Sequence, residues 1–108
     1  MAKYVLVYKA HQAFDWTTLP AEEVNKVMAS WTDWIASLGE ALQSFEVFKF
    51  GGRSVSKSGT NDADNLLTGH AIINAKDFAA AEELAKGAPN VISDKGSIQI
   101  YEALDLSN

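Results

Sequence analysis

Cysteine is absent from the 108 residues of this chain, and arginine occurs only once, at Arg53. The lack of cysteine excludes disulfide bonds, thiolate nucleophiles and cysteine-based metal sites. With one arginine, eight lysines and a formal net charge of -5, the chain lacks the clustered basic side chains that bind nucleic acid, and most of its surface would repel a phosphate backbone. We therefore expect no nucleic acid partner.

Long apolar segments are missing as well. No run approaches the length that spans a membrane, and residues 1–3 lead into a strand-like stretch without the apolar region of a signal peptide. We expect a cytoplasmic protein with no membrane contact. The chain also lacks a Gly-rich phosphate loop, a nucleophile elbow and an HExxH zinc motif. No motif therefore indicates a cofactor, and we expect none.

The remaining composition is that of an ordinary globular protein. Hydrophobic residues make up 47% of the chain and charged residues 21%. The length corresponds to one domain, so we expect residues 1–108 to form a single domain around one core.

Two segments show the pattern of amphipathic helices. Pro20 favours the start of the first helix and Gly39 its end. The apolar side chains between them recur at helical spacing on one face; they are Val24, Val27, Met28, Trp31, Trp34, Ile35 and Leu38. Asp77 can cap a second helix over residues 78–86. The inward face of that helix is small and consists of Phe78, Ala81 and Ala85.

Four segments are predicted as strands because they are rich in β-branched and aromatic residues. They span residues 3–9, 45–50, 66–75 and 97–103. Residues 53–65 are polar, with a short hairpin predicted at residues 54–57. The order β-α-β-β-α-β is that of the ferredoxin-like α+β fold, a four-stranded antiparallel sheet with two helices on one face.

The first predicted strand is apolar on both faces. Tyr4, Leu6 and Tyr8 project to one side, and Val5 and Val7 project to the other. Two helices cover only one face of such a sheet, and large exposed apolar patches are rare on monomers. We therefore expect a homodimer formed through the helix-free face.

Five segments of the sequence together resemble those of a known protein family. They are KYVLVYK at residues 3–9, SWTDWIASLGEAL at 30–42, FGGRSVSKSG at 50–59, LLTGHAIINAKDFAAAEELAKGAP at 66–89 and GSIQIYEAL at 96–104. With these segments the chain resembles the YCII-related domain family of the dimeric α/β-barrel superfamily. The resemblance implies a ferredoxin-like protomer and a dimer, the dimeric α/β barrel, in which two sheets pack face to face.

The resemblance leaves the reaction open. Most similar proteins have no assigned activity, and the wider superfamily includes cofactor-free monooxygenases, haem enzymes, and isomerase- and dehalogenase-like enzymes, so the fold does not choose among them. The chain also departs from the family pattern. Close relatives often have tyrosine at the position of His70 and cysteine at that of Ala88, and no motif here matches the His–Asp pair suspected of catalysis in some members.

His70 is the first candidate catalytic residue. It lies within a predicted strand after Gly69, and an imidazole can act as an acid or a base near neutral pH. The alternative is a core or interface histidine with one hydrogen bond. Alternation places it with Thr68, Ile72 and Asn74, on a face that either meets the partner sheet or lines a helix-side pocket.

His11 and Asp15 are further catalytic candidates, with Trp16 beside them. A histidine near a carboxylate can act as a general base, and loops at strand ends often carry function. The alternative is a solvated loop.

We expect no metal site. If the first and third main strands are parallel neighbours with Leu6 beside His70, His11 lies five residues further on, about 16 Å at 3.3 Å per residue. That offset is too large for a shared metal. Asp62 and Asp64 resemble the start of a calcium loop, but its glycine and terminal glutamate are missing.

Candidate ligand-binding residues are Tyr8, Trp31, Trp34, Lys49 and Arg53. The two tryptophans could wall a pocket between helix and sheet that accepts an aromatic ligand, although most aromatic stripes form core. Lys49 and Arg53 could attract an anionic group near such a pocket, although such charges are more often solvated.

Two functional hypotheses follow. The first is a small-molecule enzyme or ligand binder with a site between sheet and helices; whether the protein is an enzyme stays open. The second is a non-catalytic dimeric module with an accessory or regulatory role. A buried His70 lining a cavity would favour the first hypothesis, and a filled core with His70 bonded to backbone would favour the second.

Overall fold

The computed structural model describes residues 1–106. Its main sheet consists of β1 (Ala2–Ala10), β2 (Leu42–Val47), β5 (Leu67–Ala75) and β6 (Gly96–Glu102). Their order across the sheet is β2-β5-β1-β6, and neighbouring strands run antiparallel. Together with the helices on one face, this arrangement is the ferredoxin-like α+β fold, so the predicted fold class is confirmed.

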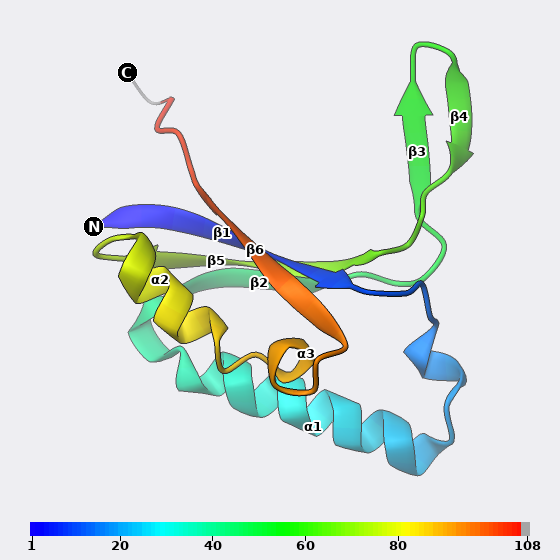
Figure 1. Cartoon of the computed structure of the whole chain (residues 1–108), viewed down its shortest axis with the longest axis horizontal. Coiled ribbons are helices and arrows are strands. Elements are labelled where there is room, and N and C mark those ends of the chain that lie inside the picture. The colour runs from blue at the N-terminus through cyan, green and yellow to red at the C-terminus, as the bar shows by residue number, and fades with distance from the viewer. Residues whose placement is uncertain (107–108) are drawn as a thin grey trace.

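The helices lie on one side of the sheet (Figure 1). They are α1 (Ala21–Ser37), α2 (Phe78–Ala85) and α3 (Pro89–Ile92), and the short 3-10 helices η1 (Trp16–Thr18) and η2 (Gly39–Ala41) flank α1. The sequence predicts α1 and α2 but not α3, because a single turn has no hydrophobic period. Within residues 1–106, no helix combines the length and the apolar character needed to cross a membrane.

The helix boundaries follow the expected residues. Asp77 caps α2, and its carboxylate accepts a hydrogen bond from the N–H of Ala80 at 2.9 Å. Gly39 follows α1 with φ of +55°, a left-handed conformation that favours glycine.

Strands β1 and β5 are neighbours but run antiparallel, which corrects the parallel arrangement assumed for the metal argument. In this topology each crossover joins two parallel strands that are separated by a third, so adjacent strands alternate in direction. Val7, not Leu6, lies opposite His70. His11 lies four residues beyond Val7 along the chain, about 13 Å at 3.3 Å per residue, so the two histidines remain apart.

The hydrophobic core lies between the sheet and the helices. Tyr4, Leu6 and Tyr8 of β1 are buried there beside Ala71 and Ile73 of β5. The helices contribute the buried side chains of Trp34, Leu38, Ala81 and Ala85. The small residues of α2 let that helix approach the sheet, as its composition predicts. Met28 is an exception in the predicted stripe, because it is 53% exposed.

Strand β2 differs from its prediction at both ends. It begins at Leu42 and ends at Val47, whereas the aromatic run predicted a strand over residues 45–50. Beyond Val47 only the N–H of Phe48 still donates to the sheet, to the carbonyl of Thr68 at 2.9 Å. The chain then turns away through Gly51, which has φ of +103°.

The second face of the sheet has no cover within the described chain. Across it, Val5 is paired with Ile72 on β5 and with Tyr101 on β6, and Val7 is paired with His70. These side chains alternate with the buried set on the same strands, so they project to the side opposite the helices.

The predicted polar excursion forms a hairpin of β3 (Arg53–Ser56) and β4 (Gly59–Asp62). It stands away from the main sheet on the helix-free side (Figure 1). All eight residues of its two strands are exposed. The short hairpin expected at residues 54–57 is therefore present, and it extends further than predicted.

Candidate functional site

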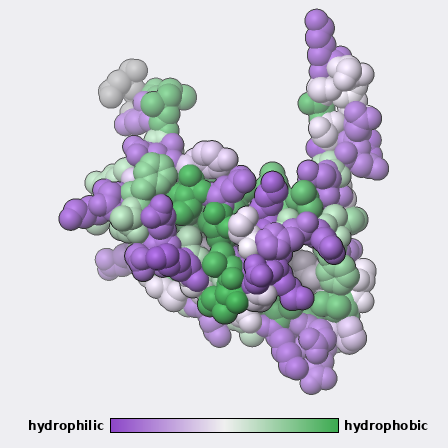
Figure 2. Space-filling view, in the orientation of Figure 1, coloured by the Kyte–Doolittle hydropathy of each residue, from purple (hydrophilic) through white to green (hydrophobic). Residues whose placement is uncertain are grey.

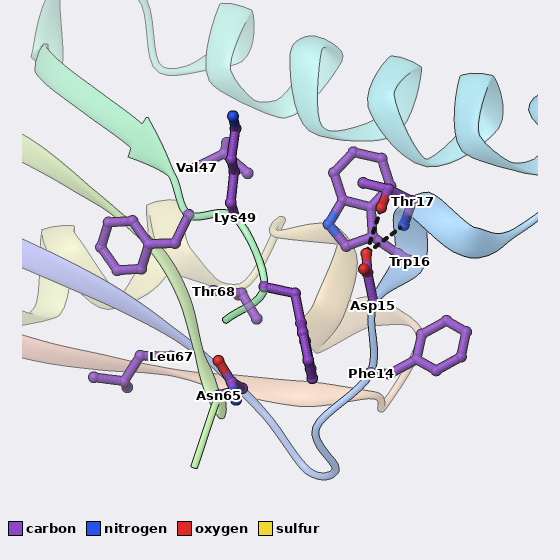
Figure 3. A pocket seen from close by; sticks show the side chains of 11 residues that line it. Phe14, Asp15, Trp16, Thr17, Val47, Lys49, Asn65, Leu67 and Thr68 are labelled. Atoms are coloured by element: carbon purple, nitrogen blue, oxygen red, sulfur yellow. Dashed lines mark hydrogen bonds between the residues drawn. The ribbon is translucent and has the colours of Figure 1, made fainter. Parts of the chain in front are cut away.

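A cleft of about 330 Å³ lies at one end of the main sheet. Three chain segments meet there: the loop after β1, the segment after β2 and the segment that enters β5 (Figure 3). The lining residues are Phe14, Asp15, Trp16, Thr17, Val47, Phe48, Lys49, Phe50, Asn65, Leu67 and Thr68. The cleft is therefore built from segments that are far apart in the sequence.

Four of the eleven residues that line the cleft are aromatic. Phe14, Phe48 and Phe50 are 56%, 41% and 52% exposed, and Trp16 is partly buried. Exposed aromatic faces gathered around one hollow are the usual lining of a site for a small organic ligand, because they offer large apolar surfaces with few torsions to fix.

Lys49 supplies positive charge to this lining. It follows β2, and it makes no ion pair or hydrogen bond with any of the residues that the structure describes. In a chain of net charge -5, an unpaired ammonium beside aromatic walls is suited to a negatively charged ligand group.

Asp15 lies in the cleft with one carboxylate oxygen already engaged. Its Oδ1 accepts hydrogen bonds from the N–H of Thr17 at 3.1 Å and from the Thr17 hydroxyl, and it thereby caps η1 (Figure 3). The hydroxyl of Thr18 donates to the Asp15 carbonyl at 2.7 Å. The two Thr17 contacts hold the carboxylate in one orientation and leave its second oxygen available as an acceptor.

His11 is not part of the cleft. It is exposed, and its backbone N–H donates to the carbonyl of Lys95 at 3.1 Å. The imidazole makes no hydrogen bond with Asp15, so the structure does not join the two as a hydrogen-bonded pair.

His70 projects from the helix-free face and does not line the cleft. Its neighbours across the strands are Val7 on β1 and Glu46 on β2. The ring of Phe48 lies 5.9 Å from the imidazole between centroids. Alternation alone leaves open which face of the sheet His70 occupies. The structure places it on the helix-free face, so His70 does not line a pocket on the helix side.

Tyr8, Trp31 and Trp34 form one aromatic cluster between α1 and the sheet. Tyr8 lies 4.8 Å from Trp31 and 5.8 Å from Trp34 between ring centroids, and the two indoles are 5.8 Å apart. The Trp34 N–H donates to the carbonyl of Leu84 at 3.0 Å. These rings pack against one another and are not among the residues that line the cleft.

The Tyr8 hydroxyl has an unusual environment. The side chain is 2% exposed, and its hydroxyl has no hydrogen-bond partner among the described residues. Burial raises the pKa of Tyr8 far above its ordinary value of 10.0, because the phenolate would lose its hydration. Tyr8 is therefore a neutral phenol at physiological pH.

Arg53 lies outside the cleft, on the hairpin. Its guanidinium contacts the carboxylate of Asp62 on the opposite strand at 2.9 Å, and both side chains are exposed. Of the predicted site residues, the structure brings only Asp15 and Lys49 together in one cleft.

Sequence reasoning missed the loop aromatics. Phe14 precedes Asp15 within the loop, and the strand predicted over residues 45–50 includes Phe48 and Phe50 because aromatic residues are enriched in strands. The sequence feature that could have indicated the site is the number of large aromatic side chains in and beside loops. Exposing such side chains to water is unfavourable, so a group of them often marks a binding site. In the described part of the chain, no three histidine or acidic side chains lie close enough together to hold a metal ion.

Comparison with known proteins gives a family and a fold. A structure of 5-chloro-2-hydroxyhydroquinone dehydrochlorinase (TftG) from Burkholderia phenoliruptrix AC1100, in complex with 2,5-dihydroxybenzoquinone, is similar with a TM-score of 0.60. The identity is 8%, and the match covers 94% of this chain and 93% of the other. No curated protein matches by sequence. The model of the YCII-related domain matches residues 2–107, and the chain therefore belongs to the YCII-related domain family.

Proposed function

We propose that this protein binds a small aromatic compound bearing an anionic oxygen in the cleft at the end of the sheet. The observation that carries the proposal is the combination of exposed aromatic walls with the unpaired ammonium of Lys49. An aromatic ring would stack against Trp16 or Phe50, and its carboxylate or phenolate would meet Lys49.

Asp15 gives the cleft a second polar contact. Because Thr17 holds one of its oxygens, the other is positioned to accept a hydrogen bond from a hydroxyl group on the ligand. A hydroxylated ring acid would satisfy both Lys49 and Asp15. Asp15 is also the residue we propose as a general base if the bound compound reacts, since His11 and His70 do not line the cleft.

The comparison with the dehydrochlorinase supports this ligand class. That protein is named for a chlorinated hydroxyhydroquinone and was solved with a dihydroxybenzoquinone. Both are small oxygenated rings of the kind that the cleft walls suit. At 8% identity the likeness establishes the fold alone, so the class of ligand rests on the walls of the cleft.

A non-catalytic role is the second candidate, and two observations favour it. The layer between helices and sheet is filled by Tyr8, Trp31 and Trp34, and His70 lies on the other face. In this case the cleft would bind a ligand without converting it, as a sensor or accessory module does.

We also propose that the protein acts as a homodimer through the helix-free face. Val5, Val7 and Ile72 form an apolar strip there, next to Tyr101, which is 57% exposed. Covering this strip with its own copy would remove apolar surface from water on both protomers.

The test of the ligand proposal is a binding screen read by tryptophan fluorescence and calorimetry. The probes are benzoate, 4-hydroxybenzoate, hydroquinone and 2,5-dihydroxybenzoquinone, with cyclohexane carboxylate as a non-aromatic control. We expect saturable binding of the aromatic anions and about fivefold weaker binding in Lys49→Gln, the loss of roughly 1 kcal/mol for one partly exposed charge contact. Hydroquinone should be unaffected by that change.

The matched control for Lys49→Gln is Lys86→Gln. Lys86 lies just after α2, pairs with Glu83 at 2.7 Å and is not in the cleft. Binding of no aromatic anion below millimolar concentration would overturn the proposal, as would equal effects of the two lysine substitutions. Product analysis by mass spectrometry after prolonged incubation then separates conversion of the ligand from binding alone.

A further inference from the structure

The β3–β4 hairpin is a two-stranded ribbon that leaves the body of the protein. All eight strand residues are exposed, and the ribbon stands on the helix-free side of the sheet (Figure 1). A lone two-stranded hairpin is only marginally stable in water, and it is usually stabilised by packing against further structure.

The base of the hairpin is nevertheless held by specific contacts. The Asn65 side-chain carbonyl accepts hydrogen bonds from the N–H groups of Gly51 and Gly52, each at 2.9 Å. The N–H of Ala63 donates to the carbonyl of Gly52 at 3.0 Å. Asn65 itself has φ of +59°, a left-handed conformation that asparagine tolerates better than most residues. The two legs of the arm are therefore tied together where they leave the domain.

The chain has more accessible surface than a compact monomer of its mass. The accessible surface is 7556 Å², whereas a compact monomer of 11.7 kDa is expected to expose about 5,900 Å². The radius of gyration is 15.1 Å, against about 13 Å for a globular domain of this length. The difference in area exceeds the roughly 800 Å² that one partner buries in a standard protein interface.

A second segment projects on the same side. Residues 103–106 rise from the end of β6 on the helix-free side, opposite the hairpin (Figures 1 and 2). Each projection exposes an aliphatic side chain: Val55 on the hairpin is 78% exposed, and Leu104 is 81% exposed. The apolar strip of Val5, Val7 and Ile72 lies on the face between them.

We infer that the β3–β4 hairpin is an arm that clasps a second copy of this chain seated on the helix-free face. The inference rests on the proposed homodimer. A second copy is the occupant because it meets the apolar strip with an identical strip, and because the excess surface is large enough to supply the roughly 800 Å² that each partner buries in a standard interface. Under two-fold symmetry each protomer both extends an arm and receives one.

The arm also connects the dimer to the cleft. Phe50 and Asn65 line the cleft, and both lie at the base of the hairpin. Seating the arm on the partner would hold this wall in place, so the cleft reaches its full affinity only in the dimer. By linkage, an aromatic ligand in the cleft must then tighten the dimer by the same factor.

The first experiment uses the absence of cysteine in the chain. Val55→Cys is labelled with a benzophenone maleimide, mixed with unlabelled parent protein enriched in ¹⁵N, and irradiated. We expect cross-links between light and heavy chains, mapped by mass spectrometry to the partner. Ile92→Cys is the matched control, because Ile92 is 73% exposed on the helix side; it should give none.

The second experiment shortens the arm. Residues 54–61 are replaced by Asn-Gly, a two-residue turn that closes hairpins, and the base at Asn65 stays intact. Sedimentation should give a dimer dissociation constant at least about tenfold higher for the shortened protein than for the parent. Addition of 2,5-dihydroxybenzoquinone should lower the dissociation constant of the parent dimer but not that of the shortened protein.

The outcomes separate this inference from the proposed homodimer. A monomeric parent at micromolar concentration would overturn both. A dimeric parent whose Val55 cross-links stay within one chain, or whose shortened variant dimerises as tightly as before, overturns the clasp alone. If the shortened variant does not fold, the cross-linking result decides.

Discussion

The ring of Tyr8 lies against the backbone of Gly69, its partner on the neighbouring strand. A Cβ atom added to Gly69 would lie 2.9 Å from Cδ2 of Tyr8 and would overlap the backbone oxygen of Glu46. Glycine at this position therefore makes room for a large aromatic ring at the centre of the sheet, and the aromatic cluster with Trp31 and Trp34 depends on it.

We predict that Gly69→Ala destabilises the protein by about 3 kcal/mol, the upper part of the range for overpacking, because one of its two contacts is with rigid backbone. The measurement is the free energy of unfolding from denaturant titration. Gly87→Ala is the control, since the nearest atom to its added Cβ would be 3.4 Å away, on the Trp34 ring. Equal stability of the two variants would show that the sheet adjusts at Gly69.

The sequence predicts those parts of the structure in which a hydrophobic pattern repeats over several residues. Alternation in β1 and the helical stripe around Trp34 repeat over several residues, so both elements and the core between them could be predicted. The one-turn helix α3 has no such repeat. The cleft could not be predicted as a site, because Trp16, Lys49 and Asn65 come from three distant segments whose loop conformations have no period.

The orphan hydroxyl of Tyr8 gives a second prediction. Tyr8→Phe should leave stability at neutral pH unchanged or raise it by about 1 kcal/mol, because it removes a buried polar group that has no partner. The free energy of unfolding of both proteins is compared at pH 7. A loss above roughly 1 kcal/mol, the typical worth of one hydrogen bond, would mean that the hydroxyl has a partner in solution.

The same residue predicts a dependence on alkaline pH. The pKa of Tyr8 is raised in the folded state, whereas in the unfolded chain it ionises near 10.0. The contribution of neutral Tyr8 to the free energy of unfolding is fully present below pH 10. It is lost as the pH rises from 10 towards the pKa of the folded state, because the unfolded state releases a proton that the folded state keeps. The free energy of unfolding, measured between pH 9 and 11, should therefore fall more steeply with pH in the parent than in Tyr8→Phe.

Trp31 should be a major contributor to stability although it is only partly buried. It contacts both Tyr8 and Trp34, so Trp31→Ala should cost about 3 kcal/mol, the lower end of the range for truncating a large aromatic side chain. Met28→Ala, one turn earlier on the exposed side of α1, should cost less than about 1 kcal/mol. Denaturant melts that rank the two in the opposite order would place the indole outside the core.

His70 provides a test of the site assignment. Because His70 does not line the cleft and adjoins it only through the ring of Phe48, His70→Phe should weaken binding of 2,5-dihydroxybenzoquinone less than Phe50→Ala does. For Phe50→Ala we expect a loss of about 0.5–1.5 kcal/mol, the range for one aromatic contact. Calorimetric titration of both variants checks this. Loss of binding in His70→Phe with normal folding would move the site to the other face.

The apolar strip on the helix-free face leads to the last prediction. Val7 lies between His70 on β5 and Gln99 on β6, at the centre of that face, so Val7→Glu would bring a carboxylate from each protomer into the proposed interface. Burying an unpaired charge costs several kcal/mol, and we expect the variant to sediment as a folded monomer at concentrations where the parent is a dimer. Ile92→Glu, which adds the same charge on the helix side, should remain dimeric. If Val7→Glu is dimeric and Ile92→Glu is monomeric, the protein associates through its helices and the strip has another role.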